Sequence, residues 1–119
     1  MPNPTIIVST WVLVSGGAWE PSAQDMAMAK AKVPEIVYAF ADEYQRSLIA
    51  DLPGYTIQYQ GIEDHGEKLI YMNAACGVSE ASSSPGEFIM VMDGGPCYFR
   101  LKFNPESGEA VEIVFNGDA

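Results

Sequence analysis

The chain has 119 residues, of which 48% are hydrophobic and 18% are charged, a composition that excludes a disordered chain and suits a single core. We therefore expect one domain that spans residues 1–119. Sixteen acidic residues against six basic ones give a net charge of -10, which argues against nucleic acid and anionic membranes as partners.

The segment Thr5–Val14 predicts the first strand, because it is rich in Ile, Val, Trp and Leu without helical spacing. Both of its faces are apolar, so we expect other parts of the chain to cover both sides of it. The segment is apolar enough for a signal sequence, but the first basic residue is Lys30. We therefore expect a soluble cytoplasmic protein, or an exported one if a leader was removed.

Two helical segments follow. Ser22 and Asp25, three residues apart, predict the start of a helix that continues with good helix formers to Lys32. Pro34 predicts a kink or a restart. The main helix comes after it, with an apolar stripe at helical spacing that comprises Val33, Ile36, Val37, Phe40, Ala41, Tyr44 and Leu48.

The rest of the chain reads as strands joined by turns. The predicted strands are Tyr55–Ile62, Glu67–Cys76, Glu87–Asp93, Cys97–Phe103 and Glu109–Phe115. A polar hairpin loop with a glycine at positive φ is expected at residues 63–66, and residues 77–86 form a polar connector. The predicted fold class is α+β, with one main helix, preceded by a short or kinked helical segment, on a curved antiparallel sheet of five to six strands in the order β-α-β-β-β-β-β.

No catalytic, metal or cofactor site is predicted. His65 is the only histidine, and the acids around it on a hairpin tip lack the preformed geometry of a metal cage. Cys76 and Cys97 match no metal-binding spacing. In a simple meander the strand Glu87–Asp93 separates them by two strand spacings, roughly 9–10 Å, so we expect free thiols.

The sheet face away from the helix is the candidate binding site. Tyr98, Arg100 and Lys102 alternate with apolar residues along one strand, and Tyr71 occupies the same face of another. Tyrosine and arginine are enriched in interface cores, although cross-strand aromatic pairing on a solvated sheet would give the same pattern. Asp93, beside Gly94-Gly95, is added as a polar anchor or as a residue that closes a turn.

The element order, Gly16-Gly17 near the start and the helix sequence FADEYQ at residues 40–45 are similar to the cystatin-like proteins. The resemblance implies a long helix wrapped by a hairpin-built sheet. It does not imply protease inhibition, because the family's Gln-x-Val-x-Gly stretch reads IQYQG at residues 57–61, inside a strand. Pro96 is followed by Cys97, where the family inhibitors have tryptophan.

Two functions remain open. The first is a non-catalytic binding or assembly module that acts as a homo-oligomer, such as a dimer, through the first strand or through the face of Tyr71, Tyr98 and Arg100. The second is a small-molecule-binding protein or enzyme with a pocket between helix and sheet. The residues expected to line that pocket are Met26, Tyr44, Tyr59, Met90 and Met92.

Overall fold

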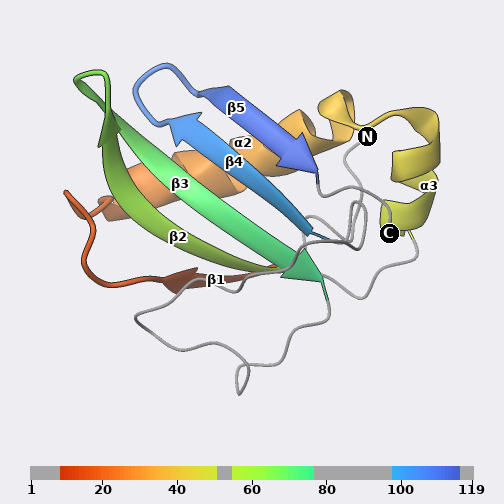
Figure 1. Ribbon diagram of the computed structural model, residues 1–119, viewed down its shortest axis with the longest axis horizontal. Helices are drawn as coiled ribbons and strands as arrows, with labels where there is room; N and C mark the ends of the chain where they lie inside the picture. Colours follow the sequence, from red (N-terminus) through yellow and green to blue (C-terminus); the bar gives the residue numbers. More distant parts are fainter. Residues whose placement is uncertain (1–8, 51–54, 77–97, 116–119) are drawn as a thin grey trace.

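A computed structural model describes residues 9–50, 55–76 and 98–115 (Figure 1). The elements in chain order are β1 (Ser9–Leu13), α2 (Ala23–Phe40), α3 (Glu43–Ala50), β2 (Tyr55–Asp64), β3 (Glu67–Cys76), β4 (Tyr98–Asn104) and β5 (Glu109–Phe115). Within these residues one main helix and a five-stranded sheet form the predicted α+β fold. The predicted strand Glu87–Asp93 lies outside the described residues.

The sheet is mixed, and this corrects the prediction of an antiparallel one. Its order is β1-β2-β3-β4-β5, and β1 pairs with β2 in parallel, with Ser9 opposite Tyr55. The remaining neighbours are antiparallel. Two helices separate β1 from β2, and such a long connection lets the chain return to the end of the sheet from which it left. The sheet of these five strands is not strongly curled (Figure 1).

Strand β1 lies at one edge of the described sheet, where it pairs only with β2. Thr10 and Leu13 are exposed, while Trp11 and Val12 are half-buried. The expectation that both faces of this strand are covered is therefore wrong for the residues that the structure describes. Trp11 packs edge-on against Tyr59 of β2, with ring centroids 6.3 Å apart, so only the side chains toward the helix join the core.

The helical segments divide at a different residue from the one predicted. Ser22 and Asp25 form a capping box at the start of α2, as expected, but the helix continues through Pro34 without a restart. Pro34 removes one intrahelical hydrogen bond, yet it is buried together with Val33 and Val37. We infer that this packing outweighs the lost bond.

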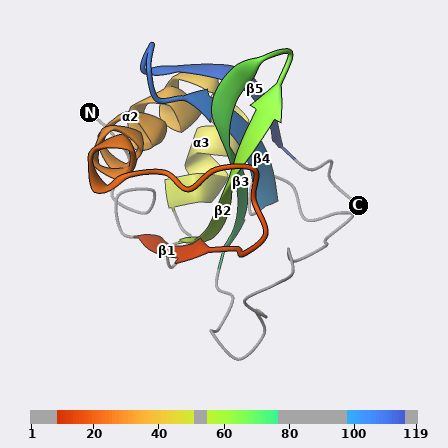
Figure 2. The ribbon, with the colours of Figure 1, turned by 90° about the vertical axis from the view of Figure 1, so that its left-hand side faces the viewer.

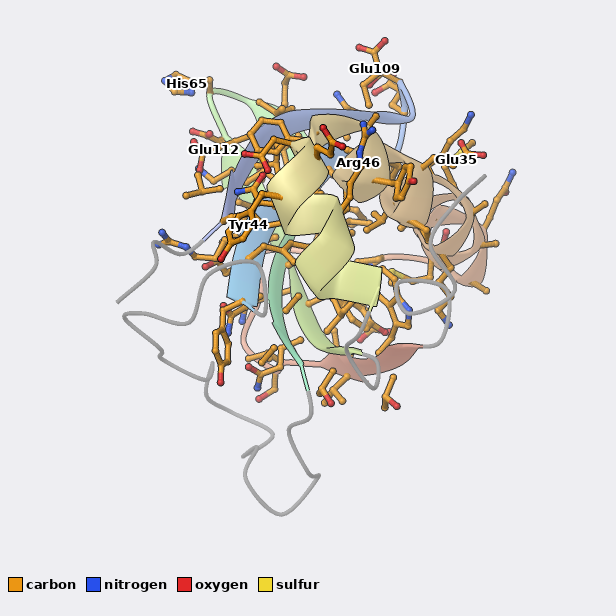
Figure 3. All side chains as sticks on the ribbon, turned by 90° about the vertical axis from the view of Figure 1, so that its right-hand side faces the viewer. Glu35, Tyr44, Arg46, His65, Glu109 and Glu112 are labelled. Carbon is orange, nitrogen blue, oxygen red and sulfur yellow. The ribbon has the colours of Figure 1, made fainter. Side chains whose placement is uncertain are left out.

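The chain breaks instead at Ala41, whose backbone is extended. Asp42 and Gln45 then form a second capping box, in which the Gln45 amide donates to Asp42 Oδ1 at 2.7 Å and the Asp42 amide donates to Gln45 Oε1 at 3.0 Å. Arg46 reaches back from α3, donating from Nε to the Tyr38 carbonyl at 2.8 Å (Figure 3). This bond supplies a partner for one of the carbonyls left open at the end of α2.

The core lies between α2 and one face of the sheet (Figure 2). The helix contributes Met26, Ala29, Val33, Val37 and Ala41, and the sheet contributes Ile57, Ile70, Met72, Ala74, Phe99, Leu101 and Phe103. Phe40 and Tyr44, which the predicted stripe placed in the core, are exposed. The stripe is interrupted between them, because α2 ends at Phe40 and α3 begins at Glu43. The β2–β3 hairpin turns at His65 and Gly66, both with positive φ, as expected for Gly66.

Strand β4 pairs directly with β3, so no other strand separates them, which corrects the predicted meander. Ala75 lies opposite Tyr98 and Ala74 opposite Phe99. The spacing argument for free thiols therefore no longer holds, although Cys97 itself lies outside the described residues.

This register leads to a prediction for the two cysteines. Cys76 follows Ala75 and Cys97 precedes Tyr98, so one more pair in the same register would be these two residues. Opposed Cα atoms in an antiparallel pair lie about 4.5–5.5 Å apart, which is within the disulfide range. We expect air-oxidised monomer to contain this disulfide, measured by peptide mass mapping with and without reductant. Quantitative alkylation of both thiols without reductant would contradict the prediction.

Candidate functional site

The sheet face away from α2 carries most of the predicted site residues. Phe99, Leu101 and Phe103 belong to the core, so the alternating residues of β4 occupy the other face. Tyr71 lies opposite Lys102 in the β3–β4 register, while Arg100 lies opposite Asn73 and Tyr98 opposite Ala75. The structure therefore brings Tyr71, Tyr98, Arg100 and Lys102 to one face. Asp93 lies outside the described residues.

Only part of this face is open to a partner. On β2 and β3 its residues Gln58, Leu69 and Ala75 are buried, and Gln58 is 0% exposed. The Asn73 amide donates to Gln58 Oε1 at 3.3 Å, so a polar pair of one buried and one half-buried residue lies in the middle of the face. The exposed part lies over the last two strands. We call Arg100, Lys102, Glu112 and Val114 the open β4–β5 surface.

The open β4–β5 surface mixes charges of both signs. Lys102 lies opposite Glu112 of β5, and its Nζ lies 3.6 Å from Asp64 Oδ2 at the end of β2. Asp64 Oδ1 also lies 2.9 Å from Nδ1 of His65. Arg100 is exposed and forms no ion pair within the part of the chain that the structure describes. It is therefore the basic group of this surface that a partner's carboxylate can reach.

Tyr71 is a half-buried polar residue of this face. Burial raises the pKa of its phenol above the usual value, and nearby Glu112 adds to the rise, while Arg100 and Lys102 partly oppose it. The phenol is therefore protonated at neutral pH. Within the described residues, no group of three or more His, Cys, Asp and Glu side chains comes together as a metal site.

Strand β5 lies at the other edge of the described sheet and carries exposed apolar side chains. Val111 is 56% exposed and Val114 is 38% exposed. Phe115 packs on Phe40 of α2, which is itself exposed, with ring centroids 5.6 Å apart. Natural edge strands are commonly protected by charged side chains, Pro or a β-bulge, and β5 has Glu109, Glu112 and a register shift opposite Lys102 and Phe103. Figure 3 shows Tyr44 of α3 and Glu112 of β5 on the same side of the molecule, at the left of the view.

The residues predicted to line a pocket between helix and sheet do not form one group. Met26 is buried in the core, Tyr44 is 60% exposed on α3 and Tyr59 is half-buried on β2. Met90 and Met92 lie outside the described residues.

Sequence reasoning missed Glu112, Val111 and Val114. The segment EAVEIVF was read as an ordinary strand.

Comparisons with protein-family models, with curated proteins and with solved structures found no match. Of the features expected from the resemblance to cystatin-like proteins, the structure has the α+β architecture with one main helix and a mostly antiparallel sheet. Among the described residues, no helix has the length and apolar character needed to cross a membrane.

Proposed function

We propose that this protein is a non-catalytic assembly module that forms a homodimer through the open β4–β5 surface. The observation that carries the proposal is that exposed Arg100 and Glu112 lie on the same face as the exposed apolar side chain of Val114, with exposed Val111 next to Glu112 in β5. Apolar area supplies the attraction in such an interface, and charges around it select the partner.

A second copy fits this surface because of its charge. A chain of net charge -10 repels its own copies except where basic and acidic groups can face each other. In a two-fold dimer the same patch meets itself, so Arg100 of each copy can lie near Glu112 of the other. Lys102 is engaged with Asp64, which leaves Arg100 for the partner.

The cystatin-like resemblance enters the proposal only as an architectural analogy. The helix beside a sheet supports it, whereas β1 and β2 pair in parallel and are joined by helices, unlike a hairpin-built sheet. The proposed dimer does not depend on that analogy.

Charge reversal at Arg100 tests the dimer. We expect sedimentation equilibrium to show a dimer for the unaltered protein, and Arg100→Glu to weaken it about 100-fold or more, because two sites then oppose like charges at several kcal/mol. The double variant Arg100→Glu/Glu112→Arg restores the opposite charges and should recover dimerisation.

Lys32→Glu is the matched control, because Lys32 is exposed on α2 and the substitution changes the net charge by the same amount. It should leave the dimer intact. The proposal fails if the unaltered protein stays monomeric at about 0.5 mM, a concentration that populates even weak complexes. It also fails if the control weakens association as much as Arg100→Glu does.

A further inference from the structure

A cavity of about 260 Å³ lies where the segment between β1 and α2 folds against β2. It is lined by residues 13–17 together with Trp19, Glu20 and Gly61. Leu13 and Val14 supply apolar side chains, and Glu20 supplies the only charge. The volume is below the roughly 300–1,000 Å³ of pockets for drug-sized ligands, so the cavity suits a smaller molecule.

The cavity walls are held in place by contacts between distant parts of the chain. Trp19 donates from Nε1 to the Ile62 carbonyl at 2.8 Å, and the Ala18 amide donates to the Gly61 carbonyl at 2.9 Å. Gln60 Nε2 donates to the Ser15 carbonyl at 2.9 Å. A ligand would therefore meet a largely preformed site, which lowers the entropy cost of binding.

The chemistry of the lining favours a cation. The face of an indole ring attracts positive charge, and Lys68 already places its Nζ 5.8 Å from the centroid of the Trp19 ring. Glu20 is exposed and is the only charged residue of the lining. The negative charge of Glu20 also extends to Tyr59, whose pKa is raised first by burial and second by Glu20. The net charge of -10 adds a general attraction for cations.

We propose that this cavity binds a small organic cation, with its ammonium group against the ring of Trp19 and beside the carboxylate of Glu20. Leu13 and Val14 would contact the apolar part of the ligand. This site is separate from the open β4–β5 surface, so the proposal does not depend on the dimer.

The test uses choline chloride and its uncharged analogue 3,3-dimethylbutan-1-ol, which has nearly the same shape. Binding is followed by the NMR signal of the Trp19 indole N–H, and Trp11→Phe identifies which of the two indole signals belongs to Trp19. Sodium chloride keeps the ionic strength constant. We expect saturable millimolar binding of choline and at least about fivefold weaker binding of the analogue, the size of a cation–π contact at a partly exposed site.

Two variants separate the charge of this site from charge in general. Glu20→Gln keeps the shape and should weaken choline binding about fivefold to tenfold, because it removes the only carboxylate of the lining. Glu35→Gln, at an exposed position of α2 that is not part of the cavity lining, should leave choline binding unchanged. Equal binding of choline and its analogue would overturn the proposal. So would an unshifted Trp19 signal at about 50 mM choline, well above the expected millimolar dissociation constant.

Discussion

Replacing Gly61 by alanine is expected to lower the free energy of unfolding by about 2–3 kcal/mol, the upper part of the range for overpacked positions. A Cβ atom at residue 61 would lie 2.1 Å from the carbonyl oxygen of Trp19, which is backbone and has no side-chain freedom to move away. Relieving that clash requires the segment before α2 to separate from β2, and this would break the bridge between Trp19 and Gly61. The free energy of unfolding is measured by urea unfolding. Thermal unfolding should show a fall in Tm of about 5–10 °C.

Gly66→Ala is the control for Gly61→Ala, because it adds the same methyl group at a glycine of the same strand pair. Gly66 has φ of +82° and nothing within 4 Å of the added Cβ, so only backbone strain opposes the substitution. A loss of about 1 kcal/mol is expected there. If Gly61→Ala costs no more than Gly66→Ala, the close approach of Trp19 to β2 is wrong, and the walls of the cavity are not held as described.

The substitutions Phe99→Ala and Arg100→Ala are expected to differ by several kcal/mol although the residues are neighbours. Phe99 is fully buried and packs edge-on against Phe115, with ring centroids 5.8 Å apart, so its truncation should cost about 3–5 kcal/mol. Arg100 is on the opposite, exposed face of β4, and its truncation should change stability by less than about 0.5 kcal/mol. Both values come from urea unfolding of the two variants at one protein concentration, chosen below the dissociation constant of the dimer.

The same pair of variants also separates folding from assembly. Below the dissociation constant of the dimer, Arg100→Ala should unfold like the unaltered protein, because the side chain contributes little to the monomer. At higher concentration the unaltered protein should gain stability with concentration and Arg100→Ala should gain less. A comparable loss of monomer stability for both variants would contradict the assignment of the two faces of β4.

The proposed site could be placed only in part from the sequence. Alternation along YFRLKF at residues 98–103 was enough to place Arg100 and Lys102 on one face and the apolar residues on the other, because strand side chains alternate with a period of two. The alternation carried no information on which part of the face is covered. Gln58 and Leu69 are buried on this face, whereas Glu112 is exposed on it.

What the sequence by itself determined are the features that arise within a few neighbouring residues. The capping box of Ser22 and Asp25 and the turn at Gly66 follow from side-chain hydrogen bonds and backbone dihedral preferences over at most four residues. Asp42 and Gln45 carried the same signal for α3.

The tertiary structure alone decided which strands are neighbours. The parallel β1–β2 pair, the direct β3–β4 pair and the contact of Trp19 with Gly61 each join residues more than 20 positions apart in the chain. Such contacts depend on how all the apolar faces can be buried at once, and no short stretch of sequence encodes that. The glycine within β2 could still have indicated a close backbone approach, because glycine weakens a strand unless another segment needs the space.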